Sequence, residues 1–151
     1  MSNCTEHRGS LFEAPVACIV NPVNCVGVMG KGLALEFKQK YPKVFSDYEH
    51  MCRRGDLKPG VLHTYQLEDG KWVVNFPTKT AWRQPSKIEY IRSGLPVLSE
   101  FVLLNAIASI AIPALGCGLG GLSWSSVKRE IETVFDAIPS GTVDVWVYPP
   151  K

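Results

Sequence analysis

The chain has 151 residues, of which 46% are hydrophobic and 20% are charged, and its net charge at neutral pH is +2. These values predict one soluble domain over residues 1–151 with a substantial core, and they exclude a strongly basic nucleic-acid-binding chain. The five cysteines lack metal-ligand spacing, which predicts reduced thiols and no zinc site. The first segment lacks the apolar stretch of a signal peptide, and together with the reduced thiols this predicts a cytoplasmic protein.

The first predicted strand, Val16–Val20, runs into the first glycine loop, Asn21–Gly32, and then into a predicted helix over Leu33–Lys40. Glycine has no side chain, so such a loop lets backbone N–H groups approach a ligand. The loop matches neither G-x-x-x-x-G-K-[ST] nor G-x-G-x-x-G, which argues against a P-loop or an ordinary Rossmann site. Asn24 is a candidate for binding ribose hydroxyls, although an asparagine in a turn needs no ligand.

A second predicted helix covers Pro42–Arg54, and two predicted strands follow at Val61–Gln66 and Trp72–Phe76. Between these strands, Leu67–Gly70 contains Asp-Gly, which predicts the turn of a β-hairpin. Strands and helices otherwise alternate, so the sequence predicts an α/β fold.

Candidate ligand-binding side chains follow the strand that ends at Phe76, namely Thr78, Lys79, Trp82 and Arg83. Open α/β sheets bind ligands at the carboxyl ends of their strands. Lys79 has two interpretations: a surface charge or phosphate contact, which its position alone favours, and a nucleophilic amine if burial kept part of it uncharged. The basic residues here are consistent with a solvated surface, but Trp82 among them modestly favours a phosphate-bearing partner with a base to stack on.

The predicted helix over Ser86–Leu104 begins with Ser86-x-x-Glu89, the pattern of a capping box. Pro96 lies inside this helix and predicts a kink or a break. The apolar tract over residues 101–115 is interrupted by polar residues and by a proline, and it is too short to span a bilayer.

The next predicted strand, Ile107–Ile112, leads to the second glycine loop, Gly116–Gly121, in which four of six residues are glycine. A predicted helix over Ser123–Ile138 and a last strand over Val143–Tyr148 complete the chain. The loop and the start of this helix together predict a nest of N–H groups for an anion. A tight turn that needs glycine only for its geometry is the alternative.

Cys25 and Cys117 lie in the two glycine loops and suggest a thiol nucleophile. No histidine follows a predicted strand in the way a catalytic partner would, so packing beneath the loops is the favoured interpretation for both cysteines.

Three segments, taken together and in order along nearly the whole chain, resemble a macrodomain. The resemblance is narrower to the branch that contains the DarG antitoxins and the terminal ADP-ribose protein glycohydrolases. The segments are Asn21–Phe37, Asn75–Lys79 with Trp82 and Arg83, and Pro113–Trp124. The resemblance implies a three-layer α/β/α fold with a central mixed, mostly parallel sheet.

The resemblance also implies a cleft for ADP-ribose between the two glycine loops. It places the distal ribose near Asn24, the adenine near Tyr148, and the catalytic lysine at Lys79, which reverses the interpretation favoured by position alone. An amine held against the anomeric carbon can form a covalent Schiff-base-type intermediate that water then hydrolyses. The remaining implied substrate-binding residues are Gly30, Lys31, Gly32, Thr78, Trp82, Arg83, Gly116, Cys117, Gly118, Leu119, Gly120 and Gly121.

Two positions depart from the family pattern. Gly120 stands where the protein-directed glycohydrolases have an aspartate that acts with the lysine, which favours thymidine-linked ADP-ribose on DNA over protein esters as the substrate. Ser10 stands after Gly9, where many macrodomains have an acidic residue that reads adenine, so adenine selectivity is expected to be weaker.

The leading hypothesis is therefore a hydrolase that removes ADP-ribose from DNA, with an antitoxin-like or counter-defence role. Its expected partners are ADP-ribose or ADP-ribosylated DNA, and we expect no cofactor, no metal, no membrane contact and a monomer. Two alternatives remain: a module that binds ADP-ribose without turnover, and an enzyme that acts on ADP-ribose-1″-phosphate.

Overall fold

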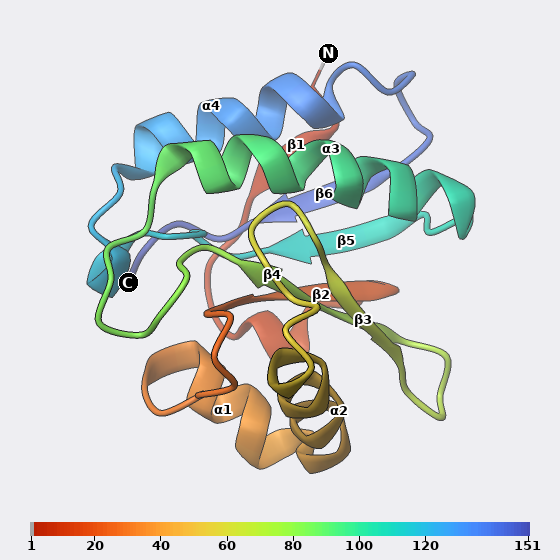
Figure 1. Cartoon of the computed structure of the whole chain (residues 1–151). Helices are drawn as coiled ribbons and strands as arrows, with labels where there is room; N and C mark the ends of the chain where they lie inside the picture. Colours follow the sequence, from red (N-terminus) through yellow and green to blue (C-terminus); the bar gives the residue numbers. More distant parts are fainter. Residues whose placement is uncertain (1) are drawn as a thin grey trace.

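The computed structural model describes residues 2–151 as a six-stranded sheet between two pairs of helices (Figure 1). The strands lie in the order β1-β6-β5-β2-β4-β3. All neighbours pair in parallel except β3, which is antiparallel to β4. The strands are β1 (Cys4–Glu6), β2 (Cys18–Val23), β3 (His63–Gln66), β4 (Trp72–Pro77), β5 (Ser109–Ile112) and β6 (Asp144–Val147).

The helices form the two outer layers. α1 (Gly32–Lys40) and α2 (Pro42–Arg53) cover one face of the sheet, and α3 (Ile88–Leu104) and α4 (Trp124–Phe135) cover the other (Figure 1). Each face has its own apolar core, because alternate residues of a strand point to opposite faces. This arrangement confirms the predicted three-layer α/β/α fold with a mixed, mostly parallel sheet.

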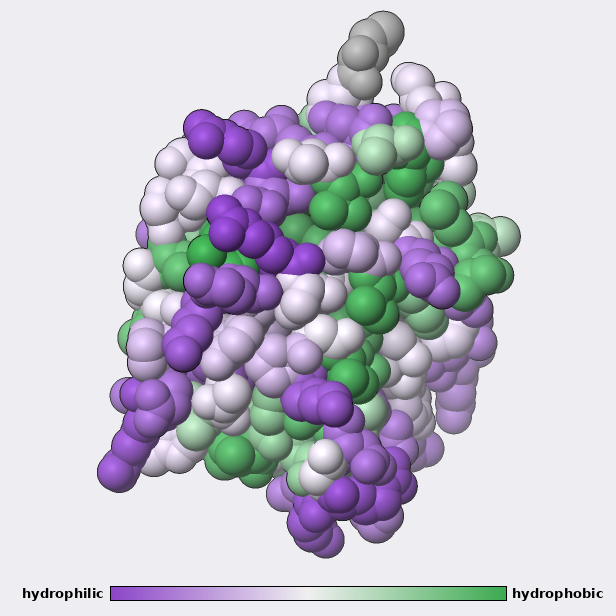
Figure 2. Space-filling view, turned by 45° about the horizontal axis from the view of Figure 1, so that its top comes forward, coloured by the Kyte–Doolittle hydropathy of each residue, from purple (hydrophilic) through white to green (hydrophobic). Residues whose placement is uncertain are grey.

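Figure 2 views the molecule with the α3 and α4 side turned forward. Hydrophilic residues cover much of this surface, and apolar residues gather near the end of α3. Val97, Leu103 and Leu104 of α3 are exposed there, whereas the opposite side of the same helix is buried on the sheet. Within residues 2–151, no helix combines the length and hydropathy needed to cross a membrane.

Most predicted elements are present, with shifted ends. The hairpin between β3 and β4 is confirmed, with Gly70 at φ 93° in its turn. The strand predicted at Val16–Val20 is instead β2, which continues to Val23 and includes Pro22. β2 pairs with β5 only at Cys18 and Ile19, so its carboxyl end has one free side and tolerates a proline.

The predicted start of α3 is wrong. The helix begins at Ile88, its N-cap residue is Lys87, and no side chain caps it. The Ser86 backbone N–H donates to Gly120 O at 3.1 Å, so Ser86 is held by the second glycine loop and not by the helix. The capping box predicted at Ser86 and Glu89 is therefore not formed.

The break predicted at Pro96 is also wrong, since α3 continues through it as one helix. Proline leaves the carbonyl four residues earlier without its helical N–H partner. Here that carbonyl belongs to Arg92, and both Pro96 and Arg92 are exposed. Solvent can therefore hydrate the carbonyl, and the helix does not need to end.

A glycine brings α3 close to β4. Gly94 is buried, and a Cβ atom added there would lie less than 3.0 Å from three ring atoms of Phe76, including 2.8 Å from Cε2. Phe76 is fully buried and lies three residues before Lys79. The packing of α3 on β4 therefore fixes the position of the strand end that carries Lys79.

Candidate functional site

The order of the strands reverses at the carboxyl ends of β2 and β5, the place where open α/β sheets form a ligand crevice. β2 leads through α1 and α2 to β3 and β4 on one side of it, and β4 leads through α3 to β5 on its other side. Ligands of open α/β sheets bind where the strand order reverses in this way. The first glycine loop follows β2 and the second follows β5, so both predicted loops flank this crevice.

The segment that follows β4, residues 78–87, is here called the lysine segment. Two backbone hydrogen bonds connect it to the first glycine loop. Thr78 N donates to Val23 O at 2.9 Å, and Cys25 N donates to Thr80 O at 3.0 Å. Lys79 lies between these two bonds and is half-buried. Its backbone is thus fixed against the first glycine loop.

The lysine segment is also tied to the second glycine loop through the Ser86–Gly120 bond. In that loop Gly118 and Leu119 are exposed, and their N–H groups have no backbone acceptor among the residues that the structure describes. Gly116, Gly118 and Gly121 have φ values of 73°, 65° and 84°, which side chains other than glycine rarely adopt. The loop therefore offers open N–H donors, as an anion nest requires.

Asn24 shapes the first glycine loop. Its side chain is buried, and its Oδ1 accepts hydrogen bonds from Val26 N at 3.1 Å and Val28 N at 3.3 Å, while Nδ2 donates to Val28 O at 2.8 Å. The Tyr48 hydroxyl lies 2.8 Å from Asn24 O and 2.9 Å from Asn24 Oδ1. These bonds give Asn24 a loop-ordering role, and ribose binding by its amide stays a prediction.

Replacing Tyr48 with phenylalanine is expected to lower the free energy of unfolding by about 1–2 kcal/mol, because Asn24 loses the hydrogen bond that the buried Tyr48 hydroxyl donates. Urea denaturation measures this change. Tyr65→Phe is the control, since the structure shows no hydrogen bond from the half-buried Tyr65 hydroxyl to any described residue. Equal stability of the Tyr48 and Tyr65 variants would contradict the role given to Tyr48.

The amino end of α1 completes the first glycine loop. Gly30, Lys31 and Gly32 are exposed, and Lys31 is the N-cap residue but makes no side-chain capping bond. The first N–H groups of a helix have no partner inside the helix, and they carry the positive end of its dipole. The end of α1 is therefore available to an anion or to a ligand hydroxyl.

An exposed aromatic side chain stands on the lysine segment. Trp82 is 53% exposed, and the Arg83 guanidinium lies 4.5 Å from the centre of its ring. Such a cation–aromatic pair beside an open tryptophan face suits a nucleic-acid base and its phosphate. Thr78, in contrast, is buried at the base of the segment.

Tyr148 and Ser10 are the two residues that the sequence analysis linked to adenine. Tyr148 follows β6, donates its N–H to Ile112 O at 3.0 Å and is buried, which raises the pKa of its phenol. The Ser10 hydroxyl accepts a hydrogen bond from Phe12 N at 3.3 Å and caps a short 3₁₀ turn. Ser10 therefore has a structural partner in the free protein.

Both cysteines of the glycine loops are protonated at neutral pH. Burial raises the pKa of the Cys25 thiol to about 11 and also raises the pKa of Cys117. Since the thiolate is the nucleophile, these values favour packing over catalysis for both residues.

A network of polar side chains, buried except for Asp47, was not predicted. Asp47 Oδ2 lies 2.7 Å from His63 Nε2, His63 Nδ1 lies 3.0 Å from Asn75 Nδ2, and Asn21 Nδ2 donates to Asn75 Oδ1 at 3.0 Å. Asn21 Nδ2 also contacts Met29 Sδ at 3.8 Å. This network joins α2, β3, β4 and β2 to the first glycine loop. Its only signal in the sequence is the pair of asparagines, Asn21 and Asn75, in otherwise apolar strands.

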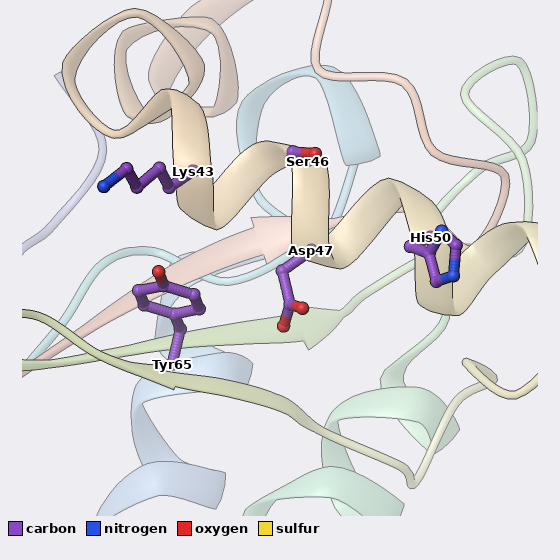
Figure 3. Close-up of a pocket in the computed structure, with 5 residues that line it drawn as sticks. All are labelled: Lys43, Ser46, Asp47, His50 and Tyr65. Carbon is purple, nitrogen blue, oxygen red and sulfur yellow. The ribbon is translucent and has the colours of Figure 1, made fainter.

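Asp47, the first member of this polar network, lines a surface hollow of about 280 Å³ between α2 and β3 (Figure 3). Lys43, Ser46, Asp47 and His50 of α2 line it together with Tyr65 of β3. Tyr65 pairs with Val73 near the start of β4, so this hollow lies away from the carboxyl ends of the parallel strands. It contains none of the predicted site residues. In the described part of the chain, no three His, Cys, Asp or Glu side chains are grouped to hold a metal ion.

Comparison with known proteins agrees with this geometry. The family model described as "Macro domain" matches residues 20–131. The chain is 47% identical over 150 residues to a DNA ADP-ribosyl glycohydrolase of Mycobacterium tuberculosis, covering 97% of this chain and 42% of that protein. It thus spans about two-fifths of the length of this relative.

Solved structures show the same likeness. The macrodomain of Mycobacterium tuberculosis DarG superposes with a TM-score of 0.94 at 44% identity, covering 98% of each chain. Thermosipho africanus DarTG in complex with ADP-ribose superposes with a TM-score of 0.85 at 35% identity, covering 94% of this chain and 40% of that one.

Proposed function

This chain belongs to the macrodomain family, and on that premise we propose that it is an ADP-ribosyl glycohydrolase that releases ADP-ribose from modified DNA. The observation that carries the proposal is the position of the lysine segment. Backbone hydrogen bonds at Thr78, Thr80 and Ser86 join it to both glycine loops, so the segment that carries Lys79 is attached to both of them.

Lys79 is the proposed nucleophile. Its Nζ attacks the anomeric carbon of the distal ribose, the bond from that carbon to the thymine nitrogen breaks, and the base leaves with the electron pair and takes a proton. Opening of the ribose ring gives a Schiff base on Nζ. Water then adds to the same carbon, the carbon–nitrogen bond to Lys79 breaks, and ADP-ribose leaves with the lysine amine restored.

The glycine loops would hold the rest of the ligand. The open N–H groups of Gly118 and Leu119 suit the diphosphate, and the uncapped end of α1 suits the distal ribose. Holding the anomeric carbon against a fixed amine lowers the entropic cost of the attack. The two loops thus provide positioning and Lys79 provides the covalent chemistry.

Three features support a DNA-linked substrate. The relative at 47% identity is named a DNA ADP-ribosyl glycohydrolase. Gly120 brings no carboxylate into the second glycine loop, and Trp82 with Arg83 gives an exposed stacking face on the lysine segment. A base next to the modified thymidine would stack on Trp82 while Arg83 contacts a phosphate.

The proposal is tested by incubating the protein with a thymidine-ADP-ribosylated oligonucleotide and, separately, with ADP-ribose-1″-phosphate. We expect release of ADP-ribose from the oligonucleotide and no phosphate from the second substrate. ADP-ribose binding without turnover of either substrate would instead identify a binding module. Phosphate release alone would identify a phosphatase.

Replacing Trp82 with alanine is expected to raise KM for the oligonucleotide about tenfold or more, since one base–aromatic stack is worth roughly 1–3 kcal/mol. Affinity for free ADP-ribose, which has no neighbouring base, should stay the same. Leu104→Ala, at an exposed apolar residue of α3, is the control and should change neither value. An unchanged KM in the Trp82 variant would show that Trp82 does not stack on a base of the substrate.

A further inference from the structure

A buried hydroxyl beneath the second glycine loop has no hydrogen-bond partner. Ser86 is 5% exposed, and its Oγ is buried without a partner among residues 2–151. A hydroxyl taken out of water without a replacement bond costs free energy, so nearly all buried hydroxyls in folded proteins are paired. This one therefore calls for a partner that is not part of the free chain.

Ser86 lies directly against the backbone of the loop. A Cβ atom added to Gly120 would lie 2.9 Å from Ser86 Cβ and closer still to its Oγ, and one added to Gly116 would lie 3.1 Å from Ser86 Cβ. The backbone bond from Ser86 N to Gly120 O holds this contact in place. Glycine at position 120 thus leaves the space that the serine hydroxyl occupies.

The open N–H groups of the loop belong to the same turn. Gly118 and Leu119 lie between Gly116 and Gly120, the two glycines that pack on Ser86. An anion bound to those N–H groups would therefore contact the same turn that packs on the hydroxyl. Rotation about the Cα–Cβ bond reorients Oγ among its staggered positions without moving the backbone.

We propose that Ser86 is a further ligand-binding residue, whose hydroxyl donates a hydrogen bond to a phosphate oxygen of a diphosphate held by the second glycine loop. The inference rests on the proposed function, and it adds a side-chain donor for the diphosphate of the proposed ligand. An O–H bond to an anionic oxygen is stronger than one between neutral groups. The hydroxyl, unpaired in the free protein, would therefore form its hydrogen bond only when the ligand binds.

The proposal predicts opposite effects on stability and on affinity. Ser86→Ala removes the unpaired hydroxyl but keeps Cβ, so the melting temperature of the free protein should stay the same or rise. The same change should weaken binding of ADP-ribose and of ADP about tenfold or more, because a bond to a charged acceptor is lost. Ser93→Ala, at an exposed serine of α3, is the matched control and should change neither affinity.

Calorimetric titration with ADP-ribose and ADP, together with thermal denaturation, decides the matter. Wild-type affinity in Ser86→Ala, or a clear fall in its melting temperature, would overturn the proposal, since the hydroxyl would then serve the free fold. A loss confined to ADP-ribose would place the contact on the distal ribose and equally overturn it. If the wild-type protein binds neither nucleotide, the proposed function fails first, so the two failures are distinguishable.

Discussion

Lys79→Ala is expected to reduce the release of ADP-ribose from a thymidine-ADP-ribosylated oligonucleotide by on the order of a thousandfold or more, because the covalent route needs a nucleophile at that position. ADP-ribose binding should change little, since the proposed binding uses backbone N–H groups of the glycine loops, which the substitution leaves in place. Single-turnover kinetics on the oligonucleotide measures the first quantity, and calorimetric titration with ADP-ribose measures the second.

Two further variants separate nucleophilicity from charge and position. Lys79→Arg keeps the positive charge, but a guanidinium stays protonated and forms no Schiff base, so it should be as inactive as alanine. Lys87→Ala removes a neighbouring cation of the lysine segment and should retain turnover. Cyanoborohydride added during turnover should trap ADP-ribose on the wild-type protein alone. Activity in Lys79→Arg would falsify the covalent mechanism.

Gly94→Ala is expected to destabilise the fold by about 2–3 kcal/mol, against the usual rule for a helix interior. Alanine has the higher helix propensity, so an exposed site would gain roughly 1 kcal/mol from this change. Here the added Cβ meets three atoms of the Phe76 ring, and overpacking of this kind typically costs about 1–3 kcal/mol or more. The sign of the measured change in urea denaturation therefore reports the close packing of α3 on β4.

A compensating substitution makes this prediction specific. Phe76→Leu removes the ring that Gly94→Ala strikes, so the double variant should lose less stability than the sum of the two single variants. Ser93→Ala, one residue away on the exposed side of α3, should not destabilise. Additive losses in the double variant would mean that Gly94 and Phe76 do not limit each other. Since β4 leads directly into the lysine segment, turnover should fall with Gly94→Ala even where the protein remains folded.

Most strands and helices, and the two glycine loops of the candidate site, could be predicted because their signals are local, whereas the three-layer arrangement came from the family resemblance. Amphipathic helices, the Asp-Gly turn and the two glycine loops each lie within one short stretch of sequence. The rule that ligands bind at the carboxyl ends of parallel strands then brings the loops together. Lys79 gained its catalytic interpretation only from the family resemblance, since a lysine after a strand can equally be a surface charge or a phosphate contact.

What could not be predicted depends on contacts between distant segments. Ser86 and Glu89 have the spacing of a capping box, but the serine faces Gly120, which lies 34 residues further along the chain. The polar chain from Asp47 to Asn21 is assembled across one helix and three strands, and no single stretch of sequence shows it. Pro96 is accommodated because both it and Arg92, whose carbonyl it leaves unpaired, are exposed, which periodicity alone does not reveal.

The short strand β1 was also missed, and its place in the sheet has a consequence for solubility. β1 pairs with β6 through Cys4, Thr5 and Glu6, and Asn3 Nδ2 donates to Phe135 O at 2.9 Å and Ile138 O at 3.0 Å. Without this strand, β6 would present a row of unpaired N–H and C=O groups, and such bare edges recruit strands from other molecules. β1 is the edge strand in place of β6, and it is short and ends at the charged Glu6, two features that discourage pairing with another molecule.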